Sequence, residues 1–131
     1  MSLAGGQYMI FDGDKVGDLL ATIFLSNRDD LLAEFDAQLR DRMSRAEKLL
    51  RQRGVTMIAA GADGITCKGV AFDPADCFAA VNSITTPYTF SMGFGSCLRE
   101  AFVALRFAKA SGRNRWARWS ADGALCLGDD D

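Results

Sequence analysis

The spacing of apolar positions changes several times along the first half of the chain. Residues 8–11 form a short apolar run followed by a Gly-Asp pair, which predicts a strand that ends in a turn. Residues 16–24 and then 31–50 repeat apolar positions every three or four residues, which predicts two helices. The second is amphipathic, and Gly54 suits its end.

The second half of the chain alternates in a similar way. Residues 55–60 and 65–72 are typical of two strands joined by the turn GADG at 61–64. Asp73 before Pro74 is the arrangement expected at a helix start. The elements predicted from there on are a helix over 73–84, a strand over 88–95, a helix over 97–114 that ends near Gly112, and a possible C-terminal edge hairpin over 115–119 and 123–128.

This order of elements predicts an α+β fold. Apart from its extra helices it matches the split βαββαβ order of the ferredoxin-like class, in which an antiparallel sheet carries helices on one face. In that topology the first strand and the second strand of the central hairpin lie side by side. Asp12 and Asp63 can therefore meet despite their separation in sequence. At 131 residues, we expect one domain over 1–131.

Charge and hydropathy exclude two classes of partner. The formal net charge is -2, so the chain lacks the basic balance of a protein that coats nucleic acid. No apolar run is long enough to span a bilayer, and the amino terminus does not resemble a signal peptide. We therefore expect a cytoplasmic protein that binds neither a membrane nor a long nucleic acid stably.

Cysteine and histidine usage restricts the chemistry. The four cysteines form no C-x-x-C pair and the chain has no histidine, so a zinc site or a histidine-dependent triad lacks its residues. Catalysis would have to use carboxylates, lysine, arginine, hydroxyls or an oxygen-bound metal. Oxygen ligands select magnesium, manganese or calcium.

The sequence FDGD at residues 11–14 places two aspartates at the end of the first predicted strand. Aspartates often only form turns and cap helices, and Asp12 and Asp63 have that simpler interpretation. Two carboxylates on neighbouring strand ends, however, repel each other unless a cation lies between them. A pair of divalent ions is the usual arrangement for phosphoryl transfer, which makes a metal site the sharper hypothesis.

Four segments resemble a known family. FDGD, GADG, SMGFG and EAFVALRFAKASGRN occur in the order and approximate spacing of the catalytic palm of GGDEF-type nucleotidyl cyclases. The sequence most resembles the minimal CRISPR-polymerase-like (mCpol) domains, which are relatives of the palm in type III CRISPR polymerase subunits. The resemblance runs from about residue 8 to 116, and its most specific part is the alanine-lysine pair followed by Gly-Arg-Asn.

The resemblance implies catalytic and metal-binding roles. It makes Asp12 and Asp63 the catalytic carboxylates, which together with the carbonyl of Gly13 hold two Mg2+ or Mn2+ ions. Lys109 and Arg113 match the basic pair that holds triphosphate oxygens, a role that suits a point charge and a planar fork. The simpler interpretation is that they are cations favoured near the end of a helix.

The resemblance also implies a wider nucleotide-binding set. Backbone amides where a helix begins can cradle phosphates. The residues assigned to nucleotide binding besides the basic pair are Asp14, Lys15, Val16, Gly17, Gly61 and Ala62.

Two departures from the family pattern bear on activity. The family signature has two glycines followed by two acids, whereas this turn has Ala62 at the second glycine and Gly64 at the second acid. The loss of an acid makes weakened or absent activity an alternative. The helix around Leu19 and Leu20 is apolar, so guanine specificity is not expected.

The leading hypothesis is a nucleotidyltransferase that makes a cyclic di- or oligonucleotide from nucleoside triphosphates. The family resemblance implies a homodimer with facing sites and a role in bacterial anti-phage signalling through a nucleotide-responsive effector. One alternative is a catalytically inactive nucleotide-binding sensor or scaffold module. Another is a ferredoxin-like protein-interaction domain, which would make the acidic and basic motifs a coincidence.

Overall fold

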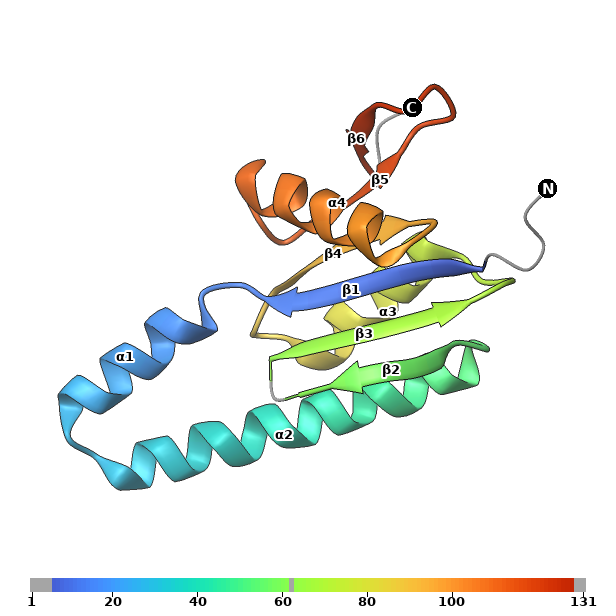
Figure 1. Ribbon diagram of the computed structural model, residues 1–131. Coiled ribbons are helices and arrows are strands. Elements are labelled where there is room, and N and C mark those ends of the chain that lie inside the picture. The colour runs from blue at the N-terminus through green and yellow to red at the C-terminus, as the bar shows by residue number, and fades with distance from the viewer. Residues whose placement is uncertain (1–5, 62, 129–131) are drawn as a thin grey trace.

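The computed structural model describes residues 6–61 and 63–128. Its elements follow the predicted order, and Figure 1 shows their arrangement. They are β1 (Gln7–Gly13), α1 (Val16–Ser26), α2 (Asp29–Gln52), β2 (Thr56–Ala60), β3 (Gly64–Gly69), α3 (Pro74–Thr85), β4 (Phe90–Gly95), α4 (Leu98–Ala110), β5 (Trp116–Trp119) and β6 (Leu125–Leu127).

The strands form one six-stranded sheet in the order β2-β3-β1-β4-β5-β6. β1 lies in the middle and is antiparallel to both β3 and β4. The first four strands therefore have the split βαββαβ topology, which confirms the predicted fold class. β5 pairs parallel to β4 and β6 antiparallel to β5, so the C-terminal hairpin does extend the sheet at its edge.

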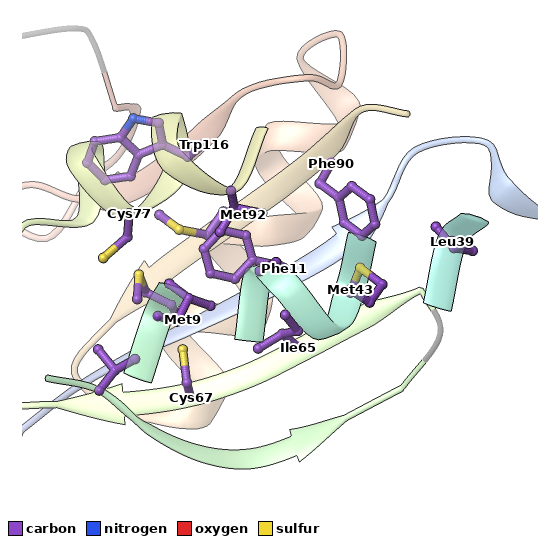
Figure 2. Packing of buried hydrophobic residues seen from close by; sticks show 14 of the residues in the cluster. Met9, Phe11, Leu39, Met43, Ile65, Cys67, Cys77, Phe90, Met92 and Trp116 are labelled. Atoms are coloured by element: carbon purple, nitrogen blue, oxygen red, sulfur yellow. The ribbon is translucent and has the colours of Figure 1, made fainter. Parts of the chain in front are cut away.

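The main core fills the space between the sheet and the two helices α2 and α3. Met9 and Phe11 of β1 alternate along the strand and are both buried, as period-two packing requires. Figure 2 shows them packed with residues of β3, β4 and α2. The amphipathic face predicted for α2 is its buried face, formed by Phe35, Leu39, Met43, Ala46 and Leu50.

The helix α4 covers the opposite face of the sheet, which differs from the expectation of helices on one face only. A side-chain carbon added at Gly93 of β4 would lie 2.0 Å from the carbonyl oxygen of Ala101. The missing side chain therefore lets the helix backbone approach the strand closely. Figure 1 shows α4 in front of the sheet and α3 behind it.

The hairpin of β5 and β6 also packs against α4. Ala104 and Ala108 of the helix and Ala117 of β5 are fully buried and form a small second cluster. Phe107, Trp119, Leu125 and Leu127 pack around these small side chains.

α1 projects beyond the end of β1, together with the start of α2 (Figure 1). Only Val16 of this helix is buried, and Leu25 is 87% exposed. The helix ends at Asn27, whose left-handed backbone conformation closes it. None of the helices among residues 6–61 and 63–128 combines the length and the apolar character needed to cross a membrane.

Two elements end earlier in the structure than the sequence predicts. β3 ends at Gly69 rather than at residue 72, because the chain turns back and the Phe72 ring lies against Gly69. α4 ends at Ala110 rather than near Gly112, and Arg113 therefore lies outside the helix.

Candidate active site

The end of β1 brings together segments from distant parts of the sequence. Asp12 is paired with Gly64 of β3 on one side and with Ser91 of β4 on the other. The amide of Gly13 donates a hydrogen bond of 2.8 Å to the carbonyl oxygen of Asp63. The topology thus places the turn that carries Asp63 beside the FDGD segment, as expected. The side chain of Asp63 is exposed.

Lys109 occupies the centre of this site. Its ammonium nitrogen Nζ lies 3.0 Å from Asp12 Oδ2, 3.0 Å from the carbonyl oxygen of Gly13 and 3.2 Å from Asp14 Oδ1. The last turn of α4 reaches the end of β1 because the helix packs closely on β4. One cation therefore lies between two carboxylates that the strand end brings together, and it offsets one of their two negative charges.

Asp14 has a different environment from Asp12. Its buried carboxylate accepts hydrogen bonds from the hydroxyls of Thr89 and Ser91, at 2.9 and 2.8 Å, from the backbone amide of Asn114 at 2.9 Å, and from Lys109. Four donors on two oxygens fill the acceptor capacity of a carboxylate. Asp14 therefore joins β1, β4 and the segment after α4.

Thr89 and Ser91 were not among the residues predicted for the site. They are polar residues in an otherwise apolar strand segment, YTFSMGFG, and buried polar side chains normally have hydrogen-bond partners. That contrast was the only signal available in the sequence. Asn114 belongs to the quoted Gly-Arg-Asn motif, but its role comes from the main chain.

The segment after α4 has an unusual backbone. Gly112, Arg113 and Asn114 have φ values of 131°, 62° and 51°. Positive φ is uncommon for residues other than glycine, and such conformations concentrate at functional sites. This left-handed run directs the Asn114 amide to Asp14.

The amino terminus of α1 is open. Lys15 precedes the helix in a left-handed conformation, and no side chain caps the end. The first intrahelical bond runs from the amide of Leu19 to the carbonyl of Lys15, so the preceding amides have no acceptor within the helix. Uncapped amides at a helix start suit an anion.

The amide of Asp14 does not belong to the expected phosphate cradle. It donates a 2.8 Å hydrogen bond to the carbonyl oxygen of Thr89 and is therefore not open to a phosphate. Of the amides expected to bind phosphate, those of Lys15, Val16 and Gly17 remain candidates. A side-chain carbon added at Gly17 would meet nothing within 4 Å, so no neighbouring residue crowds this position.

A hollow of about 700 Å³ lies between α4 and β1. It brings together three predicted residues, Asp12, Lys109 and Arg113, and is of the size that small-molecule sites have in proteins. Its other lining residues, which the sequence analysis did not select, are Ile10, Phe102, Leu105, Arg106 and Ala110. Neither Asp63 nor Gly61 lines it, and Ala62 lies outside the described residues.

The oxygens at the end of β1 suit a hard cation. Asp12 Oδ2 and the carbonyl oxygen of Gly13 already converge on the ammonium of Lys109. Among residues 6–61 and 63–128, no three acidic, histidine or cysteine side chains form a group that could hold a metal. Magnesium, however, is usually bound by one or two carboxylates together with waters and substrate phosphates. Asp12 and the carbonyl oxygen of Gly13 fit that mode of binding, and the turn that carries Asp63 lies next to them.

Gly64 stands where the family signature has its second acid. It lies opposite Asp12, and a side-chain carbon added there would be 3.6 Å from Asp12 Oδ1. An acid at this position would therefore project toward Asp12. The same carbon would lie 3.1 Å from the carbonyl oxygen of Phe11, so a larger residue needs a small backbone shift.

Comparison with solved structures shows the fold. An X-ray structure described as a diguanylate cyclase/phosphodiesterase from Caldicellulosiruptor saccharolyticus matches with a TM-score of 0.57 and 14% sequence identity. The match covers 96% of this chain and 82% of that one. The palm fold of GGDEF cyclases is therefore present. No curated protein sequence matches the chain.

Comparison with family models shows the family. The model described as the minimal CRISPR polymerase domain, mCpol, matches residues 8–119. This range runs from β1 through β5 and includes Asp12, Asp63, Lys109 and Arg113. The chain therefore belongs to the minimal CRISPR polymerase (mCpol) family, whose nucleotidyl cyclase-like palm it shares.

Proposed function

We propose that this protein is a nucleotidyltransferase that joins nucleoside triphosphates into a cyclic di- or oligonucleotide messenger. The observation that carries the proposal is the position of Lys109. Its ammonium lies against Asp12, Gly13 and Asp14 at one end of a ligand-sized hollow, with Arg113 on the same lining. A triphosphate needs such a combination of fixed cations beside a carboxylate site.

The reaction is an in-line displacement at phosphorus. The 3′ or 2′ hydroxyl oxygen of one bound nucleotide forms a bond to the α-phosphorus of another, and the bond from that phosphorus to the pyrophosphate oxygen breaks. The hydroxyl proton passes to solvent water, and pyrophosphate leaves with the electron pair of the broken bond. Lys109 and Arg113 neutralise the charge on the departing phosphates, and the open amides of Lys15, Val16 and Gly17 donate hydrogen bonds to phosphate oxygens.

Two divalent ions, Mg2+ or Mn2+, complete the proposed site. Asp12 and Asp63 would hold them through carboxylate oxygens, and Gly13 through its carbonyl. Such ions activate the attacking hydroxyl and neutralise charge on the phosphates.

The biological setting belongs to the same proposal. Joining two nucleotides requires two of them to meet, and a homodimer with facing sites would provide that geometry. We propose that the product acts on a nucleotide-responsive effector in bacterial anti-phage signalling. All four cysteines are free, which is typical of a reducing compartment and supports a cytoplasmic location.

A second candidate function is a nucleotide-binding module without catalysis. The absence of a side chain at Gly64 favours it, because the site then has one acid fewer to hold metal. The basic residues Lys109 and Arg113 would still bind a triphosphate. In that case Gly64→Glu is the first substitution expected to restore synthesis.

The test is to incubate the protein with the four ribonucleoside triphosphates, singly and mixed, with Mg2+ or Mn2+, and to resolve the products by chromatography and mass spectrometry. Asp12→Ala and Asp63→Ala should abolish the product. Asp41→Ala removes an exposed acid on α2 and serves as the matched control. A product that both site variants lack but Asp41→Ala retains supports the proposal.

Two results would contradict it. Metal-dependent nucleotide binding without any product would establish the second candidate function instead. If the folded protein neither binds a nucleotide nor forms a product, both functions are wrong.

A further inference from the structure

One side of α4 carries a row of aromatic and basic residues. Phe102, Arg106 and Lys109 of α4 are spaced three or four positions apart, so they follow one stripe, and Arg113 in the loop after the helix lines the same hollow beside β1. The family resemblance implies a role only for Lys109 and Arg113. Phe102 and Arg106 lie at the end of the hollow away from the loop that carries Arg113.

Phe102 is an exposed aromatic side chain at that end. The residue is 50% exposed, and the guanidinium carbon of Arg106 lies 5.9 Å from the ring centroid. Ile10 of β1 and Leu105 of α4 add apolar surface to the same lining. An exposed aromatic ring beside a hollow is typical of a binding surface.

The spacing along the helix suits a nucleotide. Phe102 precedes Lys109 by seven residues, which is about 10 Å along an α-helix at 1.5 Å per residue. A phosphate chain at Lys109 and Arg113 would leave room for a planar ring at Phe102 within the same hollow. Stacking of a base on an aromatic ring, with an arginine beside it, is a common mode of nucleotide recognition.

We propose that Phe102 and Arg106 form a nucleobase-binding subsite, in which the base stacks on the Phe102 ring while the phosphates of the same nucleotide contact Lys109 and Arg113. The binding of the phosphates at Lys109 and Arg113 rests on the proposed function. The occupant is a nucleotide rather than a second protein chain, because the stripe is continuous with three cations, Arg106, Lys109 and Arg113, that complement a phosphate chain.

The experiment uses two probes with the full chain in the presence of Mg2+. ATP carries a base and a triphosphate, whereas inorganic tripolyphosphate carries no base. Phe102→Ala should weaken ATP binding on the order of tenfold, the range observed for loss of one stacking partner, and leave tripolyphosphate binding unchanged. Phe102→Tyr should retain the affinity for ATP, since it keeps the ring. Isothermal titration calorimetry gives both dissociation constants.

Leu98→Ala is the matched control. Leu98 is 49% exposed on the same helix but does not line the hollow, so its removal should change neither affinity. A thermal melt of each variant confirms that it is folded.

The possible failures are distinguishable. If Phe102→Ala binds ATP as tightly as the unchanged protein, the subsite is wrong while the proposed function stands. If the unchanged protein binds neither probe, the proposed function is wrong and the subsite falls with it. A change of oligomeric state in Phe102→Ala, with ATP affinity unaltered, would show that the ring belongs to a protein interface and would overturn the proposal.

Discussion

At the scale of single residues, the two aspartates of FDGD differ in what surrounds them. Asp12 lines the hollow and its side chain is 45% exposed, so it can exchange Lys109 for another cation. Asp14 lies two residues later, beyond the end of β1, and its carboxylate is enclosed by Thr89, Ser91 and Asn114. Asp12 therefore suits chemistry, whereas Asp14 fixes the position of Lys109 and of the loop after α4.

The first prediction concerns Asp14. Asp14→Ala should lower the free energy of unfolding by about 3 kcal/mol, because it removes the acceptor of a buried ion pair and leaves buried hydroxyls without a partner. Urea denaturation measures the change. Asp18→Ala replaces an exposed acid on α1 and should stay within about 0.5 kcal/mol of the unchanged protein. A loss below about 1 kcal/mol for Asp14→Ala would show that its hydrogen bonds contribute little.

At the scale of elements, the site depends on how closely α4 approaches β4. Gly93 and Gly95 provide room on the strand, and Ala101, Ala104 and Ala108 are fully buried on the helix. This contact determines how close α4 lies to the sheet. It therefore also determines whether the Lys109 ammonium can contact the residues at the end of β1.

The second prediction tests this contact. Gly93→Ala places a methyl group 2.0 Å from the carbonyl oxygen of Ala101 and 2.3 Å from the amide of Leu105. Both contacts are backbone atoms, so the helix itself has to move. The expected loss of stability is about 3 kcal/mol, at the upper end for overpacking. Thermal and urea unfolding measure it.

Gly17→Ala is the control for that substitution. Gly17 lies in α1, and an added methyl group there would meet nothing within 4 Å. Because alanine is the better helix former, this variant should gain about 0.5–1 kcal/mol. If Gly93→Ala is as stable as the unchanged protein, the close approach of α4 does not limit the fold.

The third prediction concerns α1, which is apolar but projects from the sheet. Only Val16 of its residues is buried, so little packing protects the helix. Its amides should exchange with deuterium faster than those of β1, whose neighbours are strands on both sides. Hydrogen exchange with mass spectrometry compares residues 16–26 with residues 7–13. Equal protection of the two segments would show that α1 opens only with the whole fold.

At the scale of the whole molecule, two buried thiols make the stability of the fold depend on pH. Cys67 of β3 and Cys77 of α3 are fully buried in the same cluster, between the sheet and the helices (Figure 2). Burial raises the pKa of Cys67 from 9.0 to about 12 and that of Cys77 from 9.0 to about 11. Both thiols therefore keep their protons in the folded protein at pH values where an unfolded chain loses them.

The fourth prediction follows from that difference. Above pH 9 the unfolded chain binds fewer protons than the folded one, so the free energy of unfolding falls as the pH rises from 9 toward 12. Below pH 9 these thiols add no pH dependence. Urea denaturation at pH 8 and pH 10 should show a smaller decrease in Cys67→Ala than in the unchanged protein. Cys97→Ala, which removes an exposed thiol, should match the unchanged protein in its pH dependence. Equal decreases in all three proteins would show that the buried thiols do not contribute.

Much of the fold could be predicted from periodicity. The buried face of α2, the order of the elements along the chain and the C-terminal hairpin follow from apolar spacing, because helices and strands bury faces of different period. The position of α4 on the opposite face could not be predicted, since it depends on the space beside Gly93, which is a property of two elements together.

The candidate site divides in the same way. The sequence determined by itself which residues carry charge at strand and helix ends, namely Asp12, Asp63, Lys109 and Arg113, because turn and cap signals are local. Only the tertiary structure decided that Asp14 is enclosed while Asp12 stays accessible, and that Phe102 and Arg106 share a hollow with Lys109. These relations depend on distances between segments up to about a hundred residues apart, which the packing of α4 on the sheet sets and no local pattern encodes.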